Sequence, residues 1–156
     1  MKRILLTIIL FISMLPFLQA QEYSTGIGLR SGFANGVTLK HFQSSDVAIE
    51  GILTTRWHGF MVTGLLEFHN DLDPSGLSWF YGFGGHVGFF GGYNDHPWFD
   101  DDKDYTVIGI DGILGLEYVF EAVPISLSLD WKPAINLNGN SGFWGDDGAF
   151  SIRYVW

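Results

Sequence analysis

The 156-residue chain contains no cysteine, and this absence excludes several ways of stabilising a small protein. It can form neither disulfides nor thiolate metal sites, and it has no cysteine to carry a lipid. Basic residues are also scarce. Eight Lys and Arg stand against 17 Asp and Glu, which gives a net charge of −9 at pH 7. A nucleic-acid-binding surface needs a basic face, so we expect no nucleic-acid partner.

The first twenty residues have the three-part layout of a secretory signal peptide. Lys2 and Arg3 give a positive start, a nearly continuous apolar run follows, and Ala20 places a small residue at a cleavage position. The run is shorter than the roughly 20 residues that a membrane-spanning helix needs. We therefore predict that residues 1–20 are a cleaved signal peptide and that residues 21–156 form one exported domain.

Long apolar runs are missing from the rest of the chain. No stretch after the signal segment approaches ~20 continuous apolar residues, so no membrane helix is expected. The chain is instead rich in Gly, with 21 residues, and in aromatic residues, with 17%. Both are typical of β-barrels, where Gly permits curvature and aromatic side chains lie at the rims. A membrane protein without helices must be a closed barrel, because open sheet edges cannot lie in lipid.

Apolar and polar residues alternate with a period of two, which predicts strands rather than helices. Eight strands are expected, an even number as in bacterial single-chain barrels, and both chain ends then lie on one side. The predicted strands are 23–32, 37–42, 47–56, 60–69, 77–90, 105–120, 125–135 and 148–156. The predicted connections are 33–36, 57–59, 91–104 and 136–147 on the outer side, and 43–46, 70–76 and 121–124 on the inner side.

One face of these strands carries the charged residues, and the other carries almost none. A Lys or Arg on the lipid face of a membrane barrel costs roughly 2–4 kcal/mol at the midplane, whereas charges in a narrow lumen can pair. An eight-stranded barrel has an interior just wide enough for side chains to fill. We therefore predict a lumen closed by ion pairs; the alternative is a water-soluble barrel with these charges outside. The predicted network comprises Arg30, Lys40, Glu50, Arg56, Glu67, Asp111, Glu117, Asp130, Lys132 and Arg153.

Aromatic residues gather near both ends of the predicted strands. Two such girdles are expected where a barrel meets the two interfaces of a bilayer. Aromatic residues also favour strands in general, which is the simpler explanation. The predicted inner rim holds Tyr23, Phe68, Trp79, Phe120, Tyr154 and Trp156, and the outer rim holds Trp57, Phe60, Phe89 and Trp131.

The last strand ends the chain on an aromatic residue, with Phe150, Ile152, Tyr154 and Trp156 at alternate positions. This pattern resembles the C-terminal assembly signal of outer-membrane barrels. Residues 123–137 resemble the seventh strand of small, largely uncharacterised outer-membrane barrels of OmpA/OmpX-like architecture. The resemblance implies an all-β, eight-stranded antiparallel up-and-down transmembrane barrel in the outer membrane of a Gram-negative-type bacterium. It also implies barrel-assembly machinery, outer-membrane lipid and lipopolysaccharide as partners, but it implies no activity.

No catalytic constellation is evident. The five histidines are scattered without a metalloprotease-type spacing. Outer-membrane lipid A deacylases are also eight-stranded barrels, but their His-x-Ser-Asn stretch has no counterpart here. His86 falls on the lumen face, where a hydrogen-bonded interior group is a more common role than a catalytic base. We therefore expect a structural or surface-interaction role, with a lipid-modifying enzyme and a narrow porin-like channel as the alternatives.

An acidic run in the longest outer connection is the one candidate cation site. Carboxylates at this density could bind Ca²⁺, which takes oxygen ligands, although the spacing does not match an EF-hand. The alternatives are a solvated acidic loop, and a loop that binds lipopolysaccharide through bridging divalent cations. The residues concerned are Asp95, Asp100, Asp101, Asp102 and Asp104.

Overall fold

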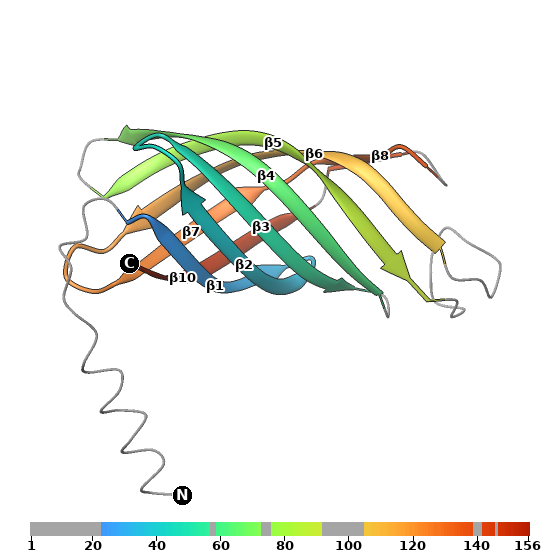
Figure 1. Ribbon diagram of the computed structural model, residues 1–156, viewed down its shortest axis with the longest axis horizontal. Helices are drawn as coiled ribbons and strands as arrows, with labels where there is room; N and C mark the ends of the chain where they lie inside the picture. The colour runs from blue at the N-terminus through green and yellow to red at the C-terminus, as the bar shows by residue number, and fades with distance from the viewer. Residues whose placement is uncertain (1–22, 57–58, 73–75, 92–104, 139–141, 146) are drawn as a thin grey trace, which may run out of the picture.

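The strands form one antiparallel sheet that curls until its edges meet (Figure 1). The pairing order is β5-β4-β3-β2-β1-β10-β7-β6, and β5 also pairs with β6, so the sheet closes into a barrel. The predicted all-β antiparallel barrel is confirmed. The structure is a computed structural model that describes residues 23–56, 59–72, 76–91, 105–138, 142–145 and 147–156. Within these ranges, no helix is long and apolar enough to cross a membrane.

The strand bounds follow the predicted segments closely. β3 and β5 coincide with their predictions, and the other strands differ by a few residues at one or both ends. The strands are β1 Thr25–Gly32, β2 Asn35–Phe42, β3 Val47–Arg56, β4 Gly59–Leu72, β5 Leu77–Phe90, β6 Tyr105–Val119, β7 Ile125–Trp131, β8 Ala134–Asn136, β9 Phe143–Trp144 and β10 Gly148–Val155.

Two of the eight positions around the barrel are each occupied by two short strands. β7 and β8 both pair with β6, while β9 pairs with β8 and β10 pairs with β7. The break between β7 and β8 falls at Pro133, which has no backbone N–H to donate to a neighbouring strand. The predicted strand 125–135 is therefore interrupted. Part of the predicted loop 136–147 is the strand β9.

β2 begins at Asn35, two residues before its predicted start. Gly36 lies within the strand and pairs with Thr54 of β3. A Cβ atom at Gly36 would lie 2.0 Å from the carbonyl oxygen of Leu53. This glycine therefore allows a close approach of two strands rather than a turn. The connection between β1 and β2 shortens to residues 33–34.

The hairpin of β4 and β5 extends beyond the predicted end of β4 at His69. The last three residues of β4 are exposed, and they pair with the first three residues of β5. Two of these three residues, Asn70 and Asp71, are polar and exposed, so the period-two pattern gives no sign that the strand continues. The connection shrinks from the predicted 70–76 to 73–76, of which 73–75 lie outside the described residues.

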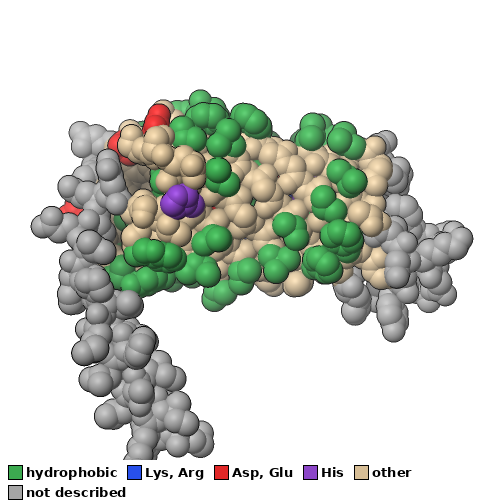
Figure 2. Space-filling view, in the orientation of Figure 1, with side chains coloured by type: hydrophobic (Ala, Val, Ile, Leu, Met, Phe, Trp, Pro, Cys, Tyr) green, Lys and Arg blue, Asp and Glu red, His purple; other side chains and the backbone are tan. Residues whose placement is uncertain are grey.

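Side chains alternate between the barrel interior and its outer surface. In β10, Phe150 and Ile152 are 47% and 43% exposed, whereas Ser151 and Arg153 are fully buried. Figure 2 shows hydrophobic side chains along this face of the barrel wall. No Lys or Arg side chain is visible on the described part of this face. The polarity is the reverse of that in a water-soluble protein, where charged groups lie outside.

The charged barrel interior as the candidate functional site

Most of the predicted network is buried inside the barrel. The structure places nine of the ten residues there, each at most 5% exposed: Arg30, Lys40, Glu50, Glu67, Asp111, Glu117, Asp130, Lys132 and Arg153. Arg56 ends β3, and its side chain lies outside the described part of the structure. The acidic run at 95–104 also lies outside the described residues. Among the residues that are described, no group of three or more potential ligands could hold a metal ion.

Lys40 is the centre of the largest group of charges. Its Nζ atom lies 2.8 Å from Glu67 Oε2, 3.3 Å from Glu117 Oε2 and 3.6 Å from Glu50 Oε2. Arg153 completes the group through Nη2, 2.5 Å from Glu50 Oε1, and through Nη1, 3.6 Å from Glu117 Oε1. We call these five residues the Lys40 cluster. All five side chains are at most 1% exposed, so solvent does not screen them.

The contacts of the Lys40 cluster cross the barrel. Lys40 belongs to β2 and Glu117 to β6, which are four places apart in a ring of eight and therefore face each other. Alternation directs both side chains to the axis, and the strands β1, β10 and β7 lie between them along the sheet. A contact of 3.3 Å between opposite walls fills the lumen at this level.

Hydroxyl groups satisfy further oxygens of the cluster. Tyr23 and Ser126 each donate a hydrogen bond of 2.8 Å to Glu117 Oε1. Thr38 donates to Glu50, and Arg153 Nη1 donates to the Ser128 hydroxyl at 2.7 Å. These partners were not in the predicted network. Parity along the strands could have identified the serines and the threonine, since they share the inward face with the charges.

A second set of charges lies nearer to β8, apart from the Lys40 cluster. Arg30 forms a two-bond ion pair with Asp130, at 2.6 and 2.7 Å. Lys132 lies 3.0 Å from both Asp111 and Asp147. His86 bridges Asp111 Oδ2 at 2.7 Å and Asn136 Oδ1 at 3.1 Å. The predicted position of His86 on the lumen face, as a hydrogen-bonded interior group, is thus confirmed.

The interior also contains an apolar cluster, which was not among the residues predicted from the sequence. It consists of Ile52, Leu65, Phe80 and Ile113, all at most 4% exposed. Phe80 lies opposite Gly115 of β6, where an added Cβ would come within 2.5 Å of the phenyl ring. The Lys40 ammonium lies 4.3 Å from the centre of the same ring. Large and small residues are thus matched across the strands, and hydrocarbon packs beside the ion pairs.

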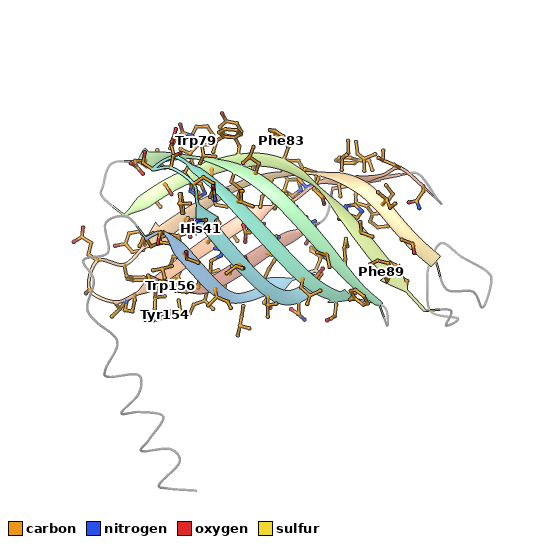
Figure 3. The ribbon with its side chains drawn as sticks, viewed as in Figure 1. His41, Trp79, Phe83, Phe89, Tyr154 and Trp156 are labelled. Atoms are coloured by element: carbon orange, nitrogen blue, oxygen red, sulfur yellow. The ribbon has the colours of Figure 1, made fainter. Side chains whose placement is uncertain are left out.

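Outward aromatic side chains lie at both ends of the barrel, and Phe83 lies between them (Figure 3). Trp79, Tyr154 and Trp156 lie toward the end that holds the C-terminus, and Phe89 lies toward the other end. Tyr23, predicted for the inner rim, is instead 8% exposed and hydrogen-bonded to Glu117. It precedes β1, and its ring is buried against Phe42 rather than facing outward. Trp57 of the predicted outer rim lies outside the described residues.

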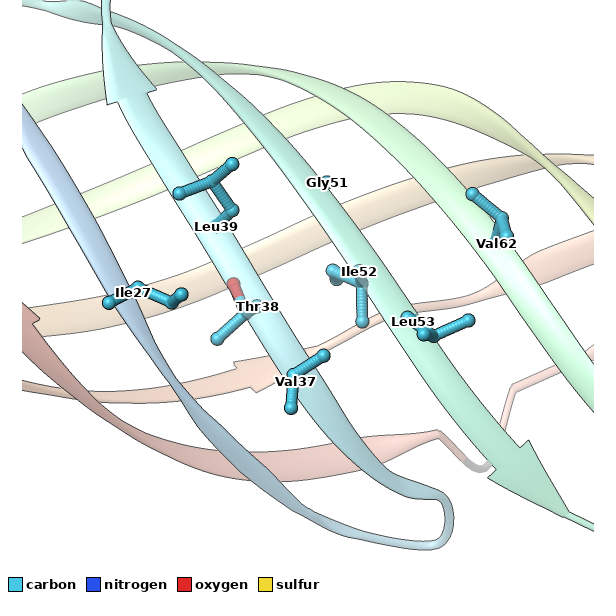
Figure 4. A pocket seen from close by; sticks show the side chains of 8 residues that line it. All are labelled: Ile27, Val37, Thr38, Leu39, Gly51, Ile52, Leu53 and Val62. Atoms are coloured by element: carbon cyan, nitrogen blue, oxygen red, sulfur yellow. The ribbon is translucent and has the colours of Figure 1, made fainter.

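The outer wall has a shallow hollow of about 220 Å³ between β1 and β4 (Figure 4). It forms beside Gly51, which has no side chain, and apolar groups such as Leu39 and Val62 surround it. Thr38 brings the only hydroxyl group to its lining, and that hydroxyl is hydrogen-bonded to Glu50 in the interior. The hollow therefore offers hydrocarbon contact and no group for chemistry.

Tyr23→Phe is expected to lower the free energy of unfolding by roughly 1.5 kcal/mol, the lower end for a hydrogen bond to a charged group. The substitution removes the donor to Glu117 Oε1 and leaves the ring in place. Tyr154→Phe is the matched control, because Tyr154 lies on the outward face beside Trp156. Urea titration of both variants measures the difference. Equal stability of the two variants would show that the buried hydroxyl contributes nothing.

The chain matches no known protein family profile and no curated protein sequence. Among solved structures, it is similar to the N-terminal β-barrel domain of Pseudomonas aeruginosa OprF, with a TM-score of 0.69 and 14% sequence identity. The similarity covers 86% of this chain and 98% of that domain. Closure of the sheet, the eight positions and the antiparallel order agree with this match. This chain has buried salt bridges inside its eight-stranded antiparallel barrel. Its fold is therefore that of the N-terminal β-barrel domain of OprF.

Proposed function

We propose that this protein is an outer-membrane β-barrel with a structural or surface-interaction role, exported by its first twenty residues and closed to ions by its buried charges. One observation carries the proposal: the described outer wall is apolar and the interior is ionic. Large apolar side chains such as Leu29 and Phe83 are 64% and 60% exposed in the middle of their strands. Such a continuous apolar band is unfavourable in water and is what acyl chains require.

The partners proposed for this barrel follow from its surface. The apolar wall would contact outer-membrane lipid, and the loops beyond it would meet lipopolysaccharide. Phe150, Ile152 and Trp156 lie on the outward face of the last strand and its end, where barrel-assembly machinery could bind them. The similarity in fold to the OprF barrel domain supports this location.

A passive role is favoured over a pore or a hydrolase by the contacts of the interior. The Lys40–Glu117 contact between opposite walls leaves no continuous path for hydrated ions at that level. The two interior serines of β7 are engaged by Glu117 and Arg153, so neither is poised as a nucleophile beside a histidine. In a passive role, the wall and the loops of the barrel make contacts with lipid and partners, and the barrel catalyses no reaction.

We expect the protein to fractionate with outer membranes and to migrate differently on gels with and without boiling. Purified protein in planar bilayers should show no steady ion conductance, because charged side chains fill the lumen. The same preparation should leave lipid A unmodified when it is mixed with outer-membrane lipid. Recovery as a soluble periplasmic protein would contradict the location. Steady conductance or altered lipid A would contradict the passive role.

A further inference from the structure

The Lys40 cluster contains more negative than positive charge. Three carboxyl groups, those of Glu50, Glu67 and Glu117, share the space with the two cations Lys40 and Arg153. Among the residues that the structure describes, no other Lys or Arg forms an ion pair with these three carboxyl groups. An unpaired charge is strongly disfavoured in a site that excludes water. One further positive charge is therefore required at this cluster.

Two carboxylate oxygens also lack hydrogen-bond donors. Glu50 Oε1 accepts from Thr38 and Arg153, and both oxygens of Glu117 have donors. By contrast, Glu50 Oε2 and Glu67 Oε1 are buried without a hydrogen-bond partner. The carboxyl groups of Glu50 and Glu67 nevertheless lie within hydrogen-bond reach of each other, and neither can donate while both are ionised. Two ionised carboxylates would repel at that separation, whereas a carboxylic acid beside a carboxylate would bond.

We propose that Glu50 and Glu67 form a proton-binding site, in which one proton is carried by Glu67 Oε1 and donated to Glu50 Oε2. This single proton supplies the missing positive charge and gives both Glu50 Oε2 and Glu67 Oε1 a hydrogen-bond partner. Glu67 is the carrier because Arg153 and Thr38 stabilise the ionised form of Glu50. Glu67 Oε2 remains free to accept from Lys40 at 2.8 Å and from His69 at 3.1 Å.

Protonation of His69 instead would balance the charge of the Lys40 cluster. It would still leave Glu50 Oε2 and Glu67 Oε1 without a hydrogen-bond donor. The imidazole Nε2 lies beside Glu67 Oε2, and Nδ1 lies 3.8 Å from Glu117 Oε2. Neither nitrogen therefore donates to Glu50 Oε2 or Glu67 Oε1. The other polar groups packed around the pair are Lys40 from β2, Glu117 from β6, Arg153 from β10, and Tyr23. Lys40 Nζ lies 3.6 Å from Glu50 Oε2, which is longer than a hydrogen bond, and none of these groups donates a hydrogen bond to Glu67 Oε1.

The test is infrared difference spectroscopy of purified protein in detergent micelles at neutral pH. The native protein should show the carbonyl band of a protonated carboxylic acid, which shifts in heavy water. Glu67→Gln should abolish this band, because its amide replaces the acid and can donate to Glu50 in the same geometry. His69→Gln should retain the band. Absence of the band from the native protein, or its persistence in Glu67→Gln, would overturn the proposal.

Unfolding by urea at several pH values gives an independent readout. Only the folded barrel holds the proton above the ordinary carboxyl range, so the folding equilibrium constant should fall about tenfold per pH unit there. Glu67→Gln should remove this slope and leave the stability at neutral pH unchanged. Glu117→Gln should lower the stability, because it replaces a carboxylate that accepts hydrogen bonds from Tyr23, Ser126 and Lys40. Equal destabilisation of the two variants would overturn the proposal. So would stabilisation by sodium relative to potassium, which would indicate a bound metal ion in place of the proton.

Discussion

Lys40→Met lowers the free energy of unfolding by about 3–5 kcal/mol, the expected loss when one member of a buried ion pair is removed. Among the described Lys and Arg residues, Lys40 alone contacts Glu67, and Lys40 and Arg153 both contact Glu50 and Glu117. Methionine matches the hydrocarbon part of the lysine side chain and can still pack on Phe80, so little of the loss comes from a cavity. Urea unfolding in detergent micelles or vesicles measures the difference.

The same substitution at Lys132 is the matched control. Lys132 contacts Asp111 and Asp147, and the Asp147 side chain is 19% exposed, so water can replace part of the lost interaction. We therefore expect a smaller loss for Lys132→Met. Combining Lys40→Met with Glu117→Leu should be less harmful than the sum of the two single changes, because the pair is removed together. A Lys40→Met protein within 1 kcal/mol of the native one would contradict a lumen held by ion pairs.

The fold and its two faces were accessible from the sequence because a strand has a period of two. In β3, Ile49 and Leu53 alternate with Glu50 and Thr54, and this parity alone decides which side chains share a face. Charge on one face and hydrocarbon on the other then indicate which face is inside. The eight strand positions followed from the turns, and the structure confirmed the barrel.

The partners inside the lumen could not be deduced in the same way. Which cation meets which carboxylate depends on how the strands are staggered around the barrel, and no local pattern records that stagger. Arg30 meets Asp130, 100 residues away, and Lys40 meets Glu117, 77 residues away. Tyr23 was misplaced for a related reason, since it precedes the first paired residue and parity does not extend to it. The four residues of the apolar cluster come from four different strands, β3 to β6, and parity along one strand does not show that they meet.

Leu29→Arg is expected to lower the free energy of unfolding in lipid by about 2–4 kcal/mol, the penalty for a basic side chain at the midplane of a barrel wall. Leu29 lies in the middle of β1, 64% exposed, and pairs with Val37 and Ile152 on its two sides. An arginine here would meet acyl chains with no partner in reach. Folding titrations in vesicles measure the penalty.

Leu72→Arg is the matched control, because Leu72 is the last residue of β4 and the penalty falls to about 0–1 kcal/mol near an interface. A membrane barrel must distinguish the two sites, since depth in the bilayer is what differs between them. A barrel in water would not distinguish the two sites, because both leucines are exposed and an arginine on either would be solvated. Equal effects at the two positions would therefore contradict the lipid-facing wall, even if the interior charges remain paired as described.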